Sequence, residues 1–113
     1  MPPLVKVSPN QSASILFERT SPEDIKYREV IVLVDGSKAG TLRFGEIIAV
    51  TILPGTHTVQ AKNGLYSSAL VAIEATSGSS HHFEVGNILT GIAAALMLIG
   101  PMPPKVFLRP KKQ

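Results

Sequence analysis

The sequence predicts an all-β fold: an antiparallel β-sandwich of six to eight short strands, with one short apolar helix near the C-terminus. Two observations predict the strands. Apolar runs of about six residues recur along the chain, and turn-forming dipeptides separate them about every eight to twelve residues. A third observation predicts the helix, because the stretch 88–102 is apolar throughout and rich in alanine, leucine and methionine, which favour helices.

Length and composition indicate a single domain covering 1–113. The chain has 113 residues, enough for one modest core. Hydrophobic residues make up 44% and charged residues only 17%, against about 25% charged residues in an average soluble domain. Some apolar surface is therefore expected to contact a partner or a membrane. With no cysteine, the chain has no disulfide, no thiolate nucleophile and no cysteine ligand for zinc.

Basic residues are concentrated near the C-terminus. The formal net charge is +3, and four of the eleven basic residues fall in the last nine positions, namely Lys105, Arg109, Lys111 and Lys112. The other basic residues are scattered and the only aromatics are four phenylalanines and two tyrosines, which argues against nucleic acid as a partner. Residues 1–6 have neither a basic nor an apolar signal region, which predicts no cleavable signal peptide. The expected location is cytoplasmic, with membrane association as an alternative.

The predicted strands follow an extended lead-in of residues 1–11, which contains three prolines. They cover 12–19, 30–34, 38–44, 47–53, 56–62, 65–75 and 80–85, with 105–109 as a candidate last strand and 110–113 as a basic tail. The first strand alternates, with Ala13, Ile15 and Phe17 on one face. The second consists of β-branched residues and leucine, which predicts a strand buried on both faces.

Three dipeptides predict tight structural turns between these strands. They are Asp35 with Gly36, Pro54 with Gly55, and Asn63 with Gly64. The first and third pairs supply the positive φ angles of a two-residue hairpin turn. The second pair suits a type II turn, because proline presets φ and glycine tolerates a positive φ. Within the strand 38–44, Gly40 predicts a bulge or the close approach of another backbone.

The stretch from about 30 to 85 resembles the PEGA-type domains and the related carboxypeptidase-regulatory-like, transthyretin-like small β-sandwiches. The residues that carry the resemblance are Val34-Asp35-Gly36, Gly40 and Leu53-Pro54-Gly55-Thr56-His57-Thr58-Val59. The sequence departs from the family pattern in that Leu53 directly precedes Pro54, and Leu65-Tyr66 stands where the family has an aromatic residue. The resemblance covers about half of the chain. It implies a noncatalytic, immunoglobulin-like accessory module of the kind often attached to membrane or surface proteins.

The apolar stretch 88–102 is the segment that departs from the strand rhythm. Asn87 would cap the predicted helix, and Gly100 with Pro101 would end it. Three interpretations remain open: a helix that covers the core or a sheet edge, a membrane anchor, and a self-association surface. A helix of this length covers roughly 22 Å, short of a hydrocarbon core of about 30 Å. The candidate contact residues are Ile88, Leu89, Gly91, Ile92, Ala95, Leu96 and Ile99, among which Gly91 and Ala95 are spaced to admit a second helix.

The histidines and carboxylates predict no metal site and no catalytic centre. Strand alternation directs His81 and His82 to opposite faces, so the two are not expected to share an ion. His57 is expected to be partly buried beside the turn at Pro54. Glu74 and Glu84 lie on neighbouring late strands and are expected on a solvated face. No glycine-rich cofactor motif occurs, so we predict no catalytic residue, no cofactor and no metal.

The predicted function is a noncatalytic interaction or scaffold module. A sheet edge or the 88–102 surface would contact a protein partner or a second copy. One alternative is a small membrane-associated protein anchored by 88–102, with the basic C-terminal residues meeting anionic headgroups. Another is a sandwich that binds a small ligand or carbohydrate, which the absence of tryptophan disfavours.

Overall fold

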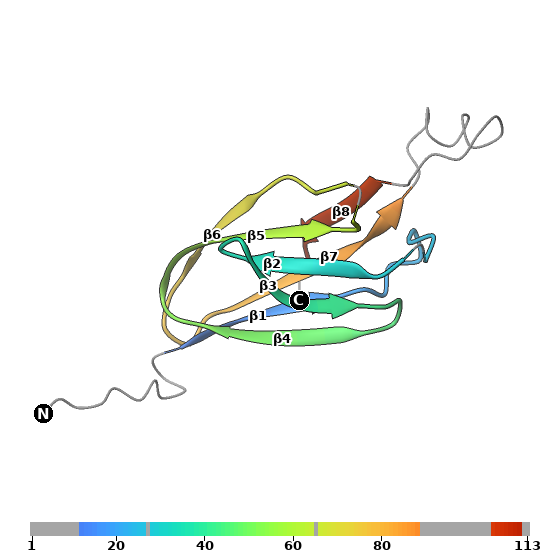
Figure 1. Ribbon diagram of the computed structural model, residues 1–113. Helices are drawn as coiled ribbons and strands as arrows, with labels where there is room; N and C mark the ends of the chain where they lie inside the picture. The colour runs from blue at the N-terminus through green and yellow to red at the C-terminus, as the bar shows by residue number, and fades with distance from the viewer. Residues whose placement is uncertain (1–11, 27, 65, 89–104, 112–113) are drawn as a thin grey trace, which may run out of the picture.

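The computed structural model describes residues 12–26, 28–64, 66–88 and 105–111. All regular secondary structure in these residues is β-strand, so the predicted all-β class is confirmed (Figure 1). The strands are β1 (Ala13–Glu18), β2 (Val30–Val34), β3 (Ser37–Leu42), β4 (Ile47–Ile52), β5 (Gly55–Lys62), β6 (Val71–Ala75), β7 (Ser80–Ile88) and β8 (Lys105–Pro110). The described part of the chain has no helix that could cross a membrane.

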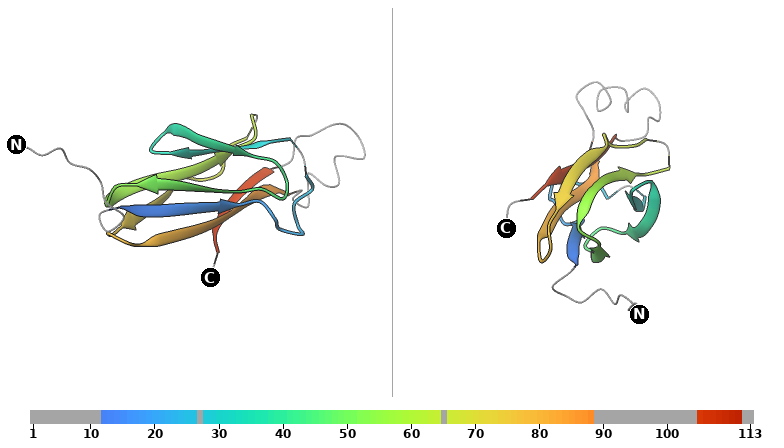
Figure 2. Two further views of the ribbon diagram at one scale, coloured as in Figure 1. Left: turned by 90° about the horizontal axis from the view of Figure 1, so that it is seen from below. Right: turned by 90° about the vertical axis from the view of Figure 1, so that its left-hand side faces the viewer.

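The strands form two four-stranded sheets that lie face to face. One sheet has the order β4-β1-β7-β8 and the other the order β3-β2-β5-β6. The views in Figure 2 show the two sheets as separate layers. The prediction of a wholly antiparallel sheet pairing is wrong at one place, because β1 and β7 are parallel. Between β1 and β7 in the sequence, most of the strands belong to the other sheet. The chain then returns to the first sheet at the end where β1 begins, so β7 runs in the same direction as β1.

The core lies between the two sheets and takes alternate side chains from each strand. In β1, Ile15 and Phe17 are fully buried, and the Phe17 ring stacks on Phe83 with the ring centroids 6.1 Å apart. In β2, Val30 and Val32 are fully buried, whereas Ile31 and Leu33 are only half-buried. The predicted burial of β2 on both faces is therefore wrong, because no third layer within the described residues covers the outer face of its sheet.

The predicted strand bounds hold best where a turn dipeptide follows directly. The strand 30–34 is reproduced without change as β2. The strand 65–75 is too long in the prediction, since β6 contains only Val71–Ala75. The segment before it folds back as a loop, because Asn63 Oδ1 accepts the N–H of Tyr66 at 2.8 Å and Ser68 N–H donates to the Ala61 carbonyl at 2.8 Å.

The predicted helix start is wrong. β7 continues to Ile88, so Asn87 is a buried strand residue and not a helix cap. Ile88 pairs with Lys105 at the beginning of β8, which confirms a last strand. The rest of the predicted helix lies outside the described residues, as do the lead-in 1–11 and the end of the basic tail.

The predicted hairpin turn at Asp35 and Gly36 is confirmed, whereas the one at Asn63 and Gly64 is wrong, because Asn63 lacks a positive φ and eight residues separate β5 from β6. Asp35 and Gly36 both have positive φ, of 53° and 82°, and Gly55 and Gly64 have φ of 131° and 95°. Gly40 confirms the predicted bulge, but its close neighbour is a side chain and not another stretch of backbone. The β2–β3 register shifts beside it, and a β-carbon at Gly40 would lie 2.4 Å from Ile48 Cδ1. β3 thus closes over the corner of the core next to β4.

Candidate functional site

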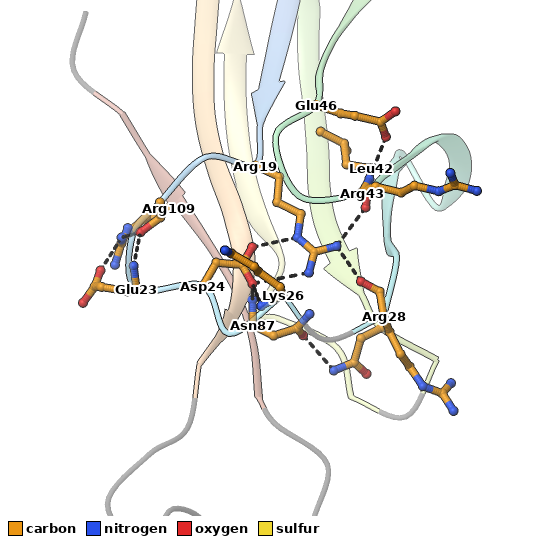
Figure 3. A network of polar contacts seen from close by, with 12 residues as sticks. Arg19, Glu23, Asp24, Lys26, Arg28, Leu42, Arg43, Glu46, Asn87 and Arg109 are labelled. Carbon is orange, nitrogen blue, oxygen red and sulfur yellow. Dashed lines mark hydrogen bonds and ion pairs between the residues drawn. The ribbon is translucent and has the colours of Figure 1, made fainter.

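A buried ion pair stands at one end of the two-sheet body. Arg19, just after β1, donates through Nε to Asp24 Oδ2 at 2.7 Å, and both side chains are almost fully buried (Figure 3). The same guanidinium donates to the backbone carbonyls of Arg28 at 2.5 Å and Leu42 at 3.0 Å. A buried charge is stable only when it is paired and hydrogen-bonded in this way. The pair therefore ties the loop after β1 to the end of β3.

The Asp24 carboxylate extends this network to β7. Its Oδ1 accepts the backbone N–H of Lys26 at 2.8 Å and of Asn87 at 3.3 Å. Ile25 N–H donates to the Asn87 carbonyl at 3.0 Å, and the Asn63 amide donates to Asn87 Oδ1 at 3.0 Å. The loop between β1 and β2 is thereby held against the end of β7 (Figure 3). We interpret the network as structural, because every charge in it faces a partner inside the protein.

The network contacts β7 at Asn87, next to the last residue pair of β7 and β8. Ile88 ends β7 and pairs with Lys105, which begins β8. The intervening residues 89–104 contain no charged residue. Six of the seven predicted contact residues of the apolar stretch lie in this segment, outside the described residues: Leu89, Gly91, Ile92, Ala95, Leu96 and Ile99. The seventh, Ile88, is a half-buried strand residue.

A second polar cluster joins β1, β7 and the residue after β8 on the outer face of the β4-β1-β7-β8 sheet. The carboxylate of Glu18 in β1 accepts hydrogen bonds from Lys111 Nζ and the Thr20 hydroxyl, and lies 3.0 Å from Nε2 of His82 in β7. The hydrogen bonds from Lys111 and Thr20, followed by the one from His82, lower the pKa of Glu18 from 4.5 to about 2 against the opposing effect of burial. These contacts therefore favour the charged form of Glu18.

Next to this cluster, on the same face of the sheet, Arg109 of β8 binds two carboxylates. Its guanidinium donates to Glu84 at 2.7 Å and to Glu23 at 2.6 Å, and these two hydrogen bonds raise the pKa of Arg109. The guanidinium also lies over the Phe107 ring, 4.4 Å from its centroid. Glu84 is thus paired across its own sheet, whereas Glu74 lies on β6 in the other sheet. The expectation that Glu74 and Glu84 lie on neighbouring strands is wrong, because their strands belong to different sheets.

The three histidines have separate partners. His57 Nδ1 lies 2.6 Å from Asp35 Oδ2, and its Nε2 lies 2.7 Å from the Leu53 carbonyl oxygen. His81 Nε2 lies 3.4 Å from the Ser79 hydroxyl, while His82 contacts Glu18. Among the described residues, no three histidine, aspartate or glutamate side chains are grouped so as to hold a metal ion. His57 is mostly buried beside the Pro54 turn, as the sequence predicts.

Two shallow hollows mark the surface of the described part. One, of about 370 Å³, lies between β6 and the start of β7, next to the end of β8. Its wall includes Val71, Ile73, His81 and Phe83. The other, of about 290 Å³, includes Ile31 on the outer face of the β3-β2-β5-β6 sheet. These hollows are where a small-ligand site would be sought, and that function stays a prediction.

The edge strands differ in how they are protected from pairing with another chain. β3 carries a bulge and Lys38, β6 carries the exposed Glu74, and β8 carries Arg109 and Pro110. Charges, bulges and prolines are the usual means by which proteins block an open strand edge. β4 has none of these. It pairs with β1 at six consecutive positions without a register shift, and residues 47–53, here called the β4 edge, contain no charge, proline or glycine.

The β4 edge presents both apolar side chains and backbone hydrogen-bonding groups. Ile47 is 52% exposed and Leu53 is 57% exposed. Arg19 N–H donates to the Glu46 carbonyl, and the strand register then directs the backbone groups of Ile48, Val50 and Ile52 toward β1. The N–H and C=O groups of Ile47, Ala49 and Thr51 consequently point away from β1. Within the described residues, β1 is the only strand paired with β4.

Comparisons of the chain with protein-family models, with curated proteins and with solved structures found no match. The resemblance to PEGA-type domains therefore rests on the turn motifs alone and stays a prediction.

Sequence reasoning anticipated a sheet edge as a contact surface, but it did not identify the edge. Strand order decides which strand is outermost, and strand order is set by long-range pairing. It also missed the Arg19–Asp24 pair and the Glu18 cluster. The only local indication was the position of Glu18 and Arg19 at the end of an alternating strand, where a charged residue on the buried side needs a partner.

Proposed function

We propose that the protein is a noncatalytic interaction module that binds an extended strand of a protein partner along the β4 edge. The observation that carries this proposal is the row of backbone groups at Ile47, Ala49 and Thr51, which points away from β1 on an uncharged and regular edge strand. An extended peptide that adds to such an edge gains main-chain hydrogen bonds, while alternate side chains provide specificity. The resemblance to PEGA-type accessory modules supports the same class of function.

The contrast between the edges argues for one binding site. Three of the four edge strands in the described residues carry a charge, bulge or proline that hinders strand addition, and β4 does not. A strand that was merely exposed by chance would gain from the same protection, because an open apolar edge is an aggregation hazard. We take the selective absence of protection at β4 as support for use of this edge.

The start of β4 is held in place before any partner arrives. Gly45 N–H donates to the Arg19 carbonyl at 2.6 Å, and Arg19 N–H donates to the Glu46 carbonyl at 2.9 Å. The Arg19 side chain is itself fixed by Asp24. An edge that is already ordered loses little conformational entropy when a strand adds, which favours binding.

The test compares two alanine-to-lysine variants in pull-down experiments. Ala49→Lys places a charge on the β4 edge, and Ala72→Lys makes the same change at an exposed position of β6 in the other sheet. A protein captured by the wild type and by Ala72→Lys, but lost with Ala49→Lys, is the expected result. A partner that Ala49→Lys retains would contradict binding at the β4 edge. Circular dichroism of both variants checks that the fold is kept.

A second candidate function is contact with an anionic membrane surface. Lys26 lies over the Phe44 ring at 4.7 Å, and Phe44 and Ile25 are 39% and 41% exposed. Ile25 contacts Asn87 near the end of β7. Because Ile88 and Lys105 are paired, a single membrane crossing between them would separate two neighbouring residues. In this candidate function the protein therefore binds one surface of the membrane and does not cross it. It predicts sedimentation with phosphatidylserine vesicles that Lys26→Glu weakens, and no vesicle binding would reject it.

A further inference from the structure

We infer that the strand that adds to the β4 edge is the β4 edge of a second copy of this chain, in antiparallel orientation and centred on Ala49. This inference rests on the proposed function and names its partner. In this arrangement Ala49 faces Ala49 of the second copy, and Ile47 faces Thr51 of the second copy. The two four-stranded sheets of the copies would then continue into each other across a two-fold axis.

The edge is complementary to itself in charge. Residues 47–53 carry no charged side chain, so antiparallel pairing of two copies brings no like charges opposite each other. A partner with a charged strand would gain no complementary charge from this edge. The regular pairing of β4 with β1 over six positions also leaves the strand straight enough to align along its length with an identical strand.

The register follows from the alternation of the backbone groups. The outward-pointing groups belong to Ile47, Ala49 and Thr51. Centring the pairing on Ala49 matches all three residues of one copy with the three of the other, so every outward N–H and C=O within β4 finds a partner. It also places the exposed Ile47 side chain against the methyl group of threonine, and the small Ala49 side chain on the two-fold axis.

The contact is small, which sets the concentration range of the test. Pairing through one short strand lies at the low end of interface sizes, below about 1,200 Å² in total, where association is weak. We therefore expect a reversible dimer at concentrations on the order of 10–1,000 μM, a range that corresponds to the weaker specific affinities.

The first experiment measures the mass of the purified full chain in solution by light scattering at rising concentration. The expected result is a shift from one chain to two for the wild type and for Ala72→Lys, and a single chain throughout for Ala49→Lys. A wild type that stays a single chain at every concentration would overturn the inference. So would a dimer that Ala49→Lys leaves intact.

The second experiment tests the register with a cysteine, which the wild-type chain lacks. Facing residues of a hydrogen-bonded antiparallel pair have α-carbons about 5.5 Å apart, a separation that a disulfide can bridge. Ala49→Cys alone should therefore form a covalent dimer under mild oxidation, at least tenfold faster than Ala72→Cys. Equal rates for the two variants would overturn the pairing at Ala49, even if Ala49→Lys had failed to fold.

The two proposals fail in different ways. If the purified chain stays monomeric but captures another protein in a manner that Ala49→Lys abolishes, the second copy is wrong and the β4 edge remains the binding site. If Ala49→Lys affects neither measurement, both proposals are wrong. Protection of the Ala49 amide from hydrogen exchange in a monomer would show that the chain itself occupies the edge, and this result too would overturn the inference.

Discussion

The imidazole of His57 lies between two groups that can only accept hydrogen bonds. Its Nδ1 is 2.6 Å from Asp35 Oδ2, and its Nε2 is 2.7 Å from the Leu53 carbonyl oxygen. Both ring nitrogens must therefore carry a proton, so the contacts select the imidazolium form. Asp35 Oδ1 in turn accepts the N–H of Thr58 at 2.9 Å. One charged ring thus connects the β2–β3 turn to the turn before β5.

We expect the stability of the fold to fall as the pH rises through the pKa of His57. The hydrogen bond to Asp35, then that to the Leu53 carbonyl and the nearby charge of Glu74, raise this pKa above its usual 6.5, against burial. The stabilisation is therefore complete below about 6.5 and is lost above the raised pKa. The hydrogen bonds from His57 and Thr58 lower the pKa of Asp35, so its contribution is lost only in acid.

The measurement is the thermal unfolding midpoint of the wild type and of Asp35→Asn between pH 5 and 9. Asparagine tolerates the positive φ of 53° at this position, so the turn itself is kept. The wild type should lose stability over this range and the variant should lose less. Parallel curves for the two proteins would show that the His57–Asp35 contact does not stabilise the fold.

Breaking the Arg19–Asp24 pair should be among the most destabilising single changes. Arg19→Met leaves a buried carboxylate without its cation, which typically costs about 3–5 kcal/mol of unfolding free energy. The double variant Arg19→Met with Asp24→Leu should lose less than the sum of the two single variants. Urea unfolding measures all of these. Arg43→Met, which breaks an exposed pair with Glu29, is the control and should cost less than about 1 kcal/mol.

Lys111→Met should make the protein more sensitive to acid. Lys111 is the largest cause of the low pKa of Glu18, about 2 instead of 4.5. Because a lowered carboxyl pKa stabilises the fold above 4.5 and loses this effect as the pH falls toward 2, the variant should unfold at a higher pH during acid titration. Lys38→Met removes an exposed lysine of β3 and should leave the acid midpoint unchanged. Equal midpoints for the two variants would contradict the role of Lys111.

Two glycines should respond differently to replacement by alanine. A β-carbon at Gly86 would lie 2.7 Å from Asp24 Oδ2 and 2.9 Å from Phe107 Cζ, whereas one at Gly40 meets only the free end of the Ile48 side chain. The Asp24 carboxylate is held by the buried network and cannot move aside, so Gly86→Ala should cost about 1–3 kcal/mol. Gly40→Ala should cost less, since Ile48 can change its rotamer. Chemical unfolding of both variants gives the comparison, and a smaller loss for Gly86→Ala would contradict it.

Local chemistry predicted the local parts of this fold. The β-branched run of β2 and the Asp35–Gly36 turn appear in the structure as expected, because both depend on steric preferences of neighbouring residues. The strand expected at 65–75 failed in its first half because side chains of Asn63 and Ser68 hydrogen-bond to the backbone and compete with strand pairing. The helix prediction extended one residue into β7, where apolar composition does not separate a buried strand from a helix.

The candidate site was less accessible to sequence reasoning, because it depends on strand order. The apolar strand predicted at 47–53 is found as β4, one residue shorter, but nothing in that stretch shows that β1 would cover only one of its sides. Arg19 pairs with Asp24, and Glu18 pairs with Lys111. In both cases the path of the folded backbone brings the two residues together. The sequence alone does not indicate either ion pair. Asp24 follows Arg19 by five residues, which is not a characteristic ion-pair spacing, and Lys111 lies far from Glu18 in the sequence.

The parallel pairing of β1 with β7 has a consequence for the order of folding. Ser14 and Ser80, which face each other in this pairing, are 66 residues apart in the sequence. β1 is an inner strand of its sheet, so during synthesis it has β4 on one side for some time before β7 leaves the ribosome. Closing so long a loop is slow compared with forming a hairpin, and we expect folding in milliseconds to seconds. In that interval the side of β1 that will pair with β7 is a second open strand edge. A nascent chain is therefore most exposed to mispairing before residue 88 has emerged.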